Sequence, residues 1–246
     1  MKLSVLMPVY NEMRTLHAIV DRVLDVDLGV RVELVVVDDC SRDGTRDLVR
    51  ALPERYRGSG HEIRAFFHEF NQGKGAAVRT ALEHATGDFL VVQDADLEYD
   101  PREYPRLLEP LLAGKADVVY GSRFMGGGGR VHRLGHWGVN QALTWVSNVL
   151  YNVRLTDMET CYKAFTCEVA VRLHLQSNRF GFDPEFTAKV CRMGFRLWEV
   201  PVSYQGRSKA EGKKISWKDG LPALTTLLRW RFAELEQRTS DRARPR

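Results

Sequence analysis

The sequence contains few cysteines, no long apolar run and no internal repeat. Only four of its 246 residues are cysteine, and they form neither a CxxC motif nor the spacing of a zinc site (Cys40, Cys161, Cys167 and Cys191). We interpret them as reduced thiols of a cytosolic protein. No stretch approaches the ~18 apolar residues of a membrane-spanning helix, and the N-terminus lacks the pattern of a signal peptide. We therefore expect a cytoplasmic protein that is soluble or peripheral at the cytoplasmic face of a membrane.

The net charge of +4 is unevenly distributed along the chain. Residues 203–246 carry 11 Lys and Arg against 5 Asp and Glu, so the positive surplus lies in this C-terminal segment. A basic segment on a near-neutral body favours a phosphate-rich partner or an anionic lipid surface. For residues 238–246 alone, a tail kept for solubility is the better explanation. We expect no nucleic acid partner.

Short apolar runs alternate with segments of helical periodicity along the first half of the chain. The pattern predicts strands at residues 3–9, 32–37, 63–68, 89–92 and 117–120, with a short later strand at 196–200. Helices are expected at 12–24, 45–52, 76–85, 102–112, 137–151, 167–173, 184–193 and from 216 onward. Strands that alternate with single helices indicate an α/β fold, a mostly parallel sheet with helices on both faces.

The strand predicted at 89–92 runs into three carboxylates, Asp94, Asp96 and Glu98. Alternate residues at the end of a strand point the same way, so these side chains can converge. Converging carboxylates repel one another unless a cation lies between them. Mg²⁺ or Mn²⁺ fits best, because these ions take oxygen ligands and leave positions open for substrate phosphate. A solvated acidic turn is the alternative.

The other predicted strands also end in polar residues, namely Tyr10-Asn11, Asp38-Asp39, Asn71 and Gly121-Ser122-Arg123. In an open parallel sheet the ligand lies at the carboxyl ends of the strands. These residues therefore predict one active site along one edge of the sheet.

Five segments, in this order, resemble family 2 glycosyltransferases of the GT-A (Rossmann-like) fold. The resemblance is closest to the polyprenyl-phosphate branch, which is similar to dolichol-phosphate mannose synthase, and it covers about residues 3–235. The segments are MPVYNE at 7–12, VVDDCSRDGT at 36–45, NQGKG at 71–75, DAD at 94–96 and GSR at 121–123.

The first strand ends suit the nucleoside of a nucleotide-sugar donor. Pro8 and Tyr10 offer an apolar wall for the base, and Asp39 can accept a hydrogen bond from an N–H that uracil and guanine both present. The resemblance implies that Glu12 and Asp39 line this pocket, and Asn71 is expected beside them. Plain turn chemistry is the alternative for Pro8 and Tyr10.

The donor diphosphate needs positive groups. Gly73-Lys74-Gly75 opens a helix, whose free N–H groups favour anions, although the glycines equally suit a close approach of helix and strand. The resemblance implies that Asp94 faces the nucleoside and orders the metal shell, that Asp96 coordinates the metal, and that Glu98 replaces a Gln ligand of relatives. Arg123 would add to the stabilisation of the leaving group.

The acceptor side lacks the QxxRW motif of many enzymes that glycosylate hydroxyl groups. A lipid phosphate is already an anionic nucleophile and needs cations rather than a base. Residues 156–163 resemble the segment that lines the acceptor site of this branch, and residues 200–215 resemble its mobile loop. We expect Arg123, Lys163 and Arg207 to hold phosphates and Lys213 to contact the donor. Asp183 or Glu185 would touch the acceptor or brace the cationic loop, and capping of the helix at Pro184 by Asp183 is the alternative.

Many relatives carry transmembrane helices after the catalytic domain, whereas here the helices at 137–151 and 217–232 are the expected contacts with a membrane surface. A membrane partner protein or a different acceptor is the alternative. We expect a catalytic domain at 1–215, with a donor half at 1–123 and an acceptor half at 124–215. Residues 216–246 would form an amphipathic helix and a basic tail. Packing of the C-terminal helix on the body or on a second subunit is the alternative, and the oligomeric state stays open.

The resulting hypothesis is an inverting, metal-dependent transfer of a hexose from a UDP- or GDP-sugar to a polyprenyl phosphate. A second hypothesis keeps the catalyst but gives it a glycan or a small molecule as acceptor. A third, a nucleotidyltransferase, would need a Gly-rich loop after the first strand, where PVYNE stands instead. A fourth, an inactive donor-binding module, is disfavoured by Asp94, Asp96 and Arg123. The donor base and the sugar remain open.

Overall fold

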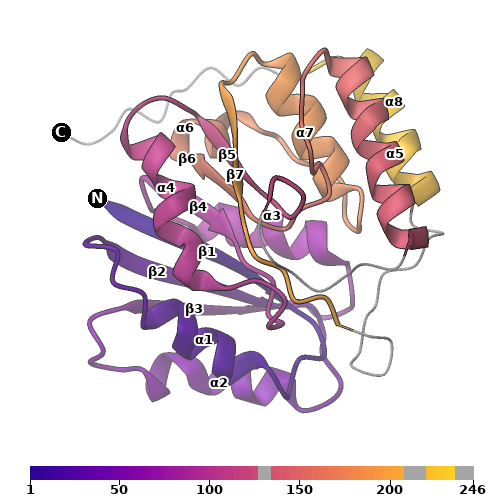
Figure 1. The fold of residues 1–246 in the computed structure, drawn as a ribbon. Coiled ribbons are helices and arrows are strands. Elements are labelled where there is room, and N and C mark those ends of the chain that lie inside the picture. The colour runs from indigo at the N-terminus through magenta and orange to yellow at the C-terminus, as the bar shows by residue number, and fades with distance from the viewer. Residues whose placement is uncertain (127–133, 208–219, 236–246) are drawn as a thin grey trace.

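The computed structural model of the chain describes residues 1–126, 134–207 and 220–235. Within these ranges strands and helices alternate through most of the chain (Figure 1). The strands are β1 (Lys2–Val9), β2 (Arg31–Asp38), β3 (Glu62–Phe67), β4 (Phe89–Val92), β5 (Val118–Ser122), β6 (Lys163–Thr166) and β7 (Leu197–Pro201). The helices are α1 (Leu16–Leu24), α2 (Thr45–Arg55), α3 (Lys74–His84), the 3-10 helix η1 (Pro101–Glu103), α4 (Tyr104–Leu112), α5 (Leu134–Tyr151), α6 (Cys167–Arg172), α7 (Phe182–Arg192) and α8 (Gly220–Phe232).

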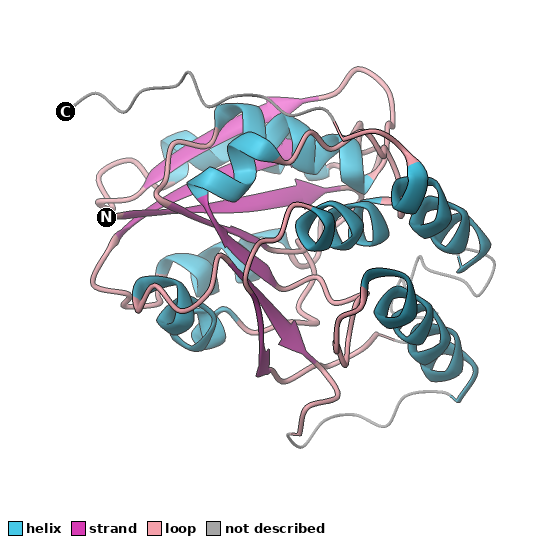
Figure 2. Cartoon of the chain, turned by 90° about the horizontal axis from the view of Figure 1, so that it is seen from above, coloured by secondary structure: helices cyan, strands magenta, loops and turns pink. Residues whose placement is uncertain are grey.

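The described strands form one seven-stranded sheet in the order β3-β2-β1-β4-β6-β5-β7. β1, β2, β3 and β4 pair in parallel, as do β5 and β7. Figure 2 shows helices on both sides of the sheet. The continuous apolar runs of β1 and β2 are buried along almost their whole length, as expected of parallel strands covered on both faces. The predicted α/β class is confirmed.

Strand β6 was not predicted. It pairs antiparallel with both β4 and β5, so that Leu90 and Val118 both lie opposite Phe165. An antiparallel strand begins at the edge where its parallel neighbours end. The segment that precedes β6, residues 156–162, therefore lies at the carboxyl edge of the sheet.

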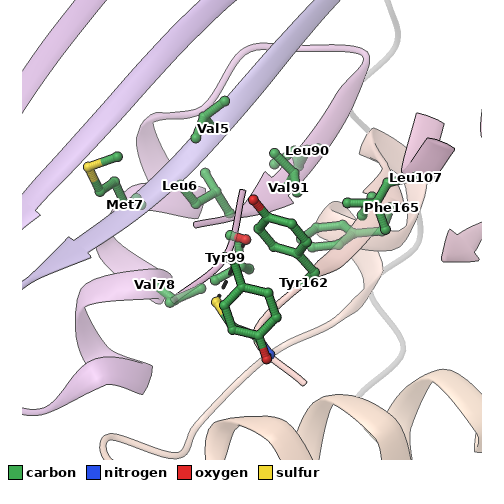
Figure 3. Close-up of a cluster of buried hydrophobic side chains, with 14 of the residues drawn as sticks. Val5, Leu6, Met7, Val78, Leu90, Val91, Tyr99, Leu107, Tyr162 and Phe165 are labelled. Atoms are coloured by element: carbon green, nitrogen blue, oxygen red, sulfur yellow. Dashed lines mark hydrogen bonds between the residues drawn. The ribbon is translucent and has the colours of Figure 1, made fainter. Parts of the chain in front are cut away.

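The main core fills both faces of the sheet. Figure 3 shows part of it, where Val5 and Leu6 of β1 lie near Val91 of β4 and Phe165 of β6. Tyr162 completes this layer together with Tyr99, whose ring centroid lies 4.6 Å away. This rigid layer supports the carboxylates that follow β4.

Helices α5 and α8 lie side by side beyond α7 (Figure 1). A small second core joins α5 to α8, and Met158 of the segment before β6 is part of it, with Leu143, Ala223 and Leu227. Residues 216–219, where we expected α8 to begin, fall outside the described ranges. α8 also exposes Phe232, so its apolar residues occupy more than the buried face, and its amphipathic character stays a prediction. None of the described helices is long and apolar enough to cross a membrane.

Candidate active site

A cavity of about 380 Å³ lies at the carboxyl edge of the sheet. Residues from the ends of β1, β2, β4 and β5 contribute to its wall, as do the loop into α3, helix α5 and the segment after β7. The predicted site residues in its wall are Pro8, Tyr10, Glu12, Asp39, Asn71, Lys74, Asp94, Asp96, Glu98, Arg123 and Arg207. The structure thus brings together residues that are up to two hundred positions apart in the sequence.

Asp39 is held by the protein on both carboxylate oxygens. Its Oδ1 accepts from Gln72 N at 2.8 Å and lies 2.7 Å from His68 Nδ1. Its Oδ2 accepts from Gly73 N at 2.7 Å and from Asn71 Nδ2 at 2.9 Å. A carboxylate offers about four acceptor positions, and these contacts fill them. Asp39 therefore positions the loop into α3, and a base N–H would have to displace one of these donors.

The glycines of the NQGKG segment permit a close approach of two chain segments. A Cβ on Gly73 would lie 2.5 Å from the carbonyl oxygen of Asn178, and one on Gly75 would lie 2.3 Å from that of Ser177. The N–H of Ala76, which would be available to an anion at the start of α3, donates instead to Asn178 O at 3.0 Å. The structure therefore favours the alternative, in which these glycines serve packing.

Lys74 and Asp94 form an ion pair inside the cavity wall. The ammonium lies 2.7 Å from Asp94 Oδ1 and 3.0 Å from Oδ2. Burial opposes both charges, but each is favoured by the other, so the pKa of Asp94 is lowered and that of Lys74 is raised. Asp94 thus faces a lysine rather than the other two carboxylates of its segment.

Arg207 lies among three carboxylates from distant parts of the chain. Its Nη2 is 2.6 Å from Asp96 Oδ2, its Nη1 is 3.0 Å from Glu12 Oε2, and its Nε is 3.5 Å from Glu98 Oε1. Glu98 also accepts from the Tyr204 hydroxyl at 2.7 Å and from Arg207 N at 2.8 Å. One cation therefore already lies where Asp96 and Glu98 converge.

These contacts decide how far the predicted metal ligands fit a metal. Among the described residues no group of three His, Cys, Asp or Glu is arranged to hold an ion. Asp94, one of the three predicted ligands, pairs with Lys74. Asp96 and Glu98 do converge on one positive group. Burial, then the nearby carboxylates of Asp94 and Glu98, raise the pKa of Asp96 to about 7 against the effect of Arg207. Two crowded carboxylates fit a hard divalent cation that takes its other ligands from phosphate and water.

Arg123 follows β5 and is held in a fixed orientation. Its Nε lies 2.6 Å from Asp157 Oδ2 and its Nη2 lies 2.7 Å from Asp157 Oδ1, a bidentate pair, and the guanidinium lies 5.1 Å from the centre of the Tyr204 ring. Asp157 is buried, and Arg123 lines the cavity. An orientation fixed on one side leaves the other side of the guanidinium available to an anion.

Lys163 was expected to hold phosphate, and the structure does not bring it into the cavity wall. Its side chain is 0% exposed and lies 2.5 Å from Asp183 Oδ1. It also donates to the carbonyl oxygen of Thr160, and its ammonium lies 4.9 Å from the centre of the Tyr120 ring. Because Lys163 is the first residue of β6, its side chain packs between the sheet and α7. Lys213, expected to contact the donor, lies outside the described residues.

The sequence reasoning did not single out several residues of the cavity wall. They are Phe124, Trp137, Asn140, Glu159, Arg179 and Phe180. Trp137 and Asn140 lie about one turn apart on α5, and Glu159 belongs to the segment before β6, which we expected to line the acceptor site without naming this residue. Burial, and then the charge of Asp183, raise the pKa of Glu159 to about 8. The position of Glu159 could not be predicted because the sequence does not show that β6 runs antiparallel to its neighbours.

The family model described as "Glycosyl transferase family 2" matches residues 4–170, more than half of the chain. The chain belongs to glycosyl transferase family 2. The resemblance carried by the five sequence segments is therefore confirmed.

Two relatives support the polyprenyl-phosphate branch for this glycosyltransferase. It is 29% identical over 245 residues to an undecaprenyl-phosphate mannosyltransferase of Micrococcus luteus, with 95% of each chain covered. It is 29% identical over 241 residues to a dolichol-phosphate mannosyltransferase of Pyrococcus furiosus, covering 94% of this chain but 64% of the relative. The chain thus spans less than two thirds of that archaeal protein.

The fold is also found in a solved glycosyltransferase. The structure of glucosyl-3-phosphoglycerate synthase from Mycobacterium tuberculosis in complex with Mn²⁺, UDP and phosphoglyceric acid matches with a TM-score of 0.68 and 19% identity. The match covers 95% of this chain and 79% of the synthase. At this identity the likeness concerns the fold, and it supports the GT-A architecture of the glycosyltransferase.

Proposed function

We propose that this family 2 glycosyltransferase transfers a hexose, mannose or glucose, from a UDP- or GDP-sugar to a polyprenyl phosphate, with inversion at the anomeric carbon. The proposal rests on the charge distribution of the cavity. Asp96 and Glu98 converge on a cation at one end of it, and Arg123 lines the cavity after β5. The similarity to an undecaprenyl-phosphate mannosyltransferase over 95% of both chains supports the lipid phosphate as acceptor.

Asp96 and Glu98 would hold Mg²⁺ or Mn²⁺, with Asp94 ordering the surroundings through Lys74. Such an ion supplies positive charge to the departing nucleoside diphosphate. Support comes from the M. tuberculosis synthase, which has the same fold and was crystallised with UDP and either Mn²⁺ or Mg²⁺.

The cations of the chain have separate tasks in this scheme. Arg207, which here contacts Asp96 and Glu98, would bind diphosphate oxygens of the donor, for which its planar guanidinium is suited. Arg123 keeps its orientation because Asp157 holds it on one side. Pro8 and Tyr10 would contact the base, with Glu12 and Asn71 beside them. Lys213 is proposed as a further donor contact.

The chemical step needs no base when the acceptor is a phosphate. A phosphate oxygen forms the new bond to the anomeric carbon, while the bond from that carbon to the donor diphosphate breaks and its electron pair leaves with the nucleoside diphosphate. No proton has to move. The protein contributes orientation and the exclusion of water.

Helices α5 and α8 are proposed to contact the membrane that carries the acceptor. Trp137, Trp145 and Val149 follow one another on α5 at intervals of eight and four positions, which places successive ones on the same side of the helix. Trp145 is 67% exposed and Phe232 of α8 is 81% exposed. Arg229 and Arg231 stand beside Phe232, and exposed aromatic residues interleaved with arginine suit the headgroup layer of a membrane.

The domain boundaries remain part of the proposal. Residues 1–215 would form the catalytic domain, whose donor half ends at 123, and residues 216–246 would add the C-terminal helix and tail. The cytoplasmic face is the expected location.

A thermal-shift panel tests the donor side. UDP, GDP and their sugars are each added with Mn²⁺ or with EDTA. A ligand at 100 times its Kd should stabilise the folded state by roughly 2.7 kcal/mol. We expect stabilisation that depends on metal and on one of the two bases, and its loss in Asp96→Asn. No shift with any nucleotide would contradict the proposal.

A transfer assay tests the acceptor side. The donor selected above is offered with a detergent-dispersed polyprenyl phosphate, with the dephosphorylated alcohol, and without lipid. We expect product only with the phosphate. Turnover in detergent-free solution with an added glycan or small-molecule acceptor, and without lipid phosphate, would instead support that class of acceptor.

A further inference from the structure

Glu159 lies in the cavity wall, and one of its carboxyl oxygens has no hydrogen-bond partner among the described residues. It lies in the segment before β6 and lines the cavity together with Arg123 and Trp137. Its Oε1 is shielded from solvent and has no hydrogen-bond partner within the described parts of the chain. A buried polar atom without a partner costs roughly 1–3 kcal/mol. Such a group in a ligand cavity is explained most simply if the ligand supplies the partner.

Among the described residues, the charged side chains that act most strongly on Glu159 already have partners of their own. They are Asp183 from α7, Lys163 from β6, Arg123 after β5, and Asp157 from the segment of Glu159 itself. Lys163 is paired with Asp183, and Arg123 is paired with Asp157. Because both cations are already neutralised, an additional negative charge at Glu159 is unfavourable. Burial and Asp183 raise its pKa to about 8, so the carboxyl group carries a proton at neutral pH.

A protonated carboxyl group in this position offers an O–H donor to the ligand. A phosphate oxygen is its best partner, because the negative charge of the phosphate keeps the proton on Glu159 and strengthens the hydrogen bond. Arg123 lines the same cavity, and its guanidinium has N–H donors beyond the two that bind Asp157, so that it can also donate to the phosphate. A hydroxyl acceptor would instead need an ionised Glu159 as general base.

We propose that Glu159 binds the acceptor, donating a hydrogen bond from its protonated carboxyl group to an oxygen of the acceptor's phosphate. This inference rests on the proposed function, since it requires a phosphate as acceptor. Glu159 keeps its proton throughout the transfer, and the phosphate oxygen attacks the anomeric carbon without deprotonation. Glu159 is therefore an acceptor-binding residue and not a base.

The test compares wild type, Glu159→Gln, Glu159→Ala and the control Glu168→Gln, which changes an exposed glutamate of α6. The KM for a polyprenyl phosphate and kcat are measured from pH 6 to 9.5. The Kd of the nucleoside diphosphate with Mn²⁺ is measured by calorimetry, and thermal melts show whether each variant is folded. An alkyl phosphate has its second pKa near 6, so it does not titrate above pH 8, where the change in Glu159 is expected.

We expect the acceptor KM of wild type and of Glu168→Gln to rise above pH 8, by about tenfold per pH unit, as Glu159 loses its proton. Glu159→Gln still donates a hydrogen bond. It should stay within about threefold of wild type at pH 7 and lack the alkaline rise. Glu159→Ala should raise the acceptor KM about tenfold at pH 7, the loss of roughly one hydrogen bond. The Kd of the nucleoside diphosphate should change in none of them.

Two outcomes overturn the inference while leaving the proposed function intact. If wild type and Glu159→Gln give the same pH profile, Glu159 does not bind the acceptor through its proton. If activity increases with pH through 8 and Glu159→Gln loses it about a hundredfold, Glu159 is a base. A wild-type enzyme that binds the metal-nucleotide complex but transfers nothing to a lipid phosphate overturns the acceptor proposal and this inference together.

Discussion

Glu33 and Glu159 lie at opposite edges of the same sheet, and their surroundings differ in kind. Glu33, near the start of β2, accepts from Ser4 Oγ at 2.5 Å, from Thr86 N at 2.8 Å and from Thr86 Oγ1 at 2.9 Å, and Lys2 Nζ lies 3.3 Å away. These partners lower the pKa of Glu33 despite its burial. Glu159 has an oxygen without a partner in the described chain, and its pKa is raised.

The comparison indicates which buried carboxylates have a structural role and which are available to bind a ligand. At the amino edge the chain satisfies its own buried charge, so Glu33 stabilises the fold and has nothing left to offer. At the carboxyl edge Asp96 and Glu98 are crowded around a cation that a ligand can replace, and Glu159 has an oxygen without a partner in the described chain. Mutation of Glu33 should therefore change stability, and mutation of Asp96, Glu98 or Glu159 should change activity.

Asp96→Asn is expected to give the largest effect on activity. The variant keeps the shape of the side chain but loses the charge that would hold the metal, so hexose transfer should fall about 10²–10³-fold. Its melting temperature should stay near that of wild type, because the crowding by Asp94 and Glu98 is relieved while Arg207 loses a partner. Rates and melts measured side by side check this. Retained transfer would remove Asp96 from the metal site.

Lys163→Met tests whether this buried lysine belongs to the fold or to the site. The change leaves Asp183 buried without its cation, so the free energy of unfolding should fall by about 3 kcal/mol. The Kd of the nucleoside diphosphate should not change. Lys115→Met, at an exposed position, is the control. A stable variant with weakened phosphate binding would restore the phosphate-holding role first predicted for Lys163.

Glu33→Gln should act on stability alone. Loss of the charged hydrogen-bond acceptor should lower the free energy of unfolding by about 2 kcal/mol at pH 7. Because folding lowers the pKa of Glu33, its stabilising effect is present above the usual value of 4.5 and disappears as the pH falls through the folded-state pKa. Denaturant titrations should show the gap to wild type narrowing below pH 4.5. Glu83→Gln, a change at an exposed position, should have the same free energy of unfolding as wild type at each pH. A reduced kcat in the folded Glu33→Gln variant would show that Glu33 affects activity as well as stability.

Arg207→Ala should give the smallest of these effects. Without the guanidinium, Asp96 and Glu98 are free to bind a divalent ion, so the affinity for Mn²⁺ alone should rise about tenfold, or 1.4 kcal/mol. The affinity for the Mn²⁺-nucleotide complex should fall, since a phosphate contact is lost. Calorimetry measures both, with Arg42→Ala as the exposed control. An unchanged Mn²⁺ affinity would show that Arg207 does not compete with the metal.

The sequence was most informative where a local pattern determines the structure. The apolar runs of β1, β2 and β4 and the polar residues after them predicted the parallel sheet and the edge on which the cavity lies. The five sequence segments predicted the family. These features depend on neighbouring residues, and their physical causes, burial and strand direction, can be read over a few positions.

What the sequence did not reveal depends on contacts between distant segments. Strand β6 has only four residues, and its antiparallel direction is set by pairing with β4 and β5. The burial of Lys163 against Asp183 and the isolation of Glu159 follow from that direction. The four donors to Asp39 likewise come from a loop some thirty residues away. No window of local sequence contains these partners.

The position of Trp137 bears on the route by which the lipid acceptor would reach the cavity. The same side chain lines the cavity and is 46% exposed on α5, about two turns before Trp145. If that helix rests on a bilayer, the acceptor arrives by lateral diffusion within two dimensions and does not have to leave the lipid. The velocity should then follow the mole fraction of polyprenyl phosphate in the vesicle, and dilution with inert phospholipid at constant bulk concentration should slow the enzyme.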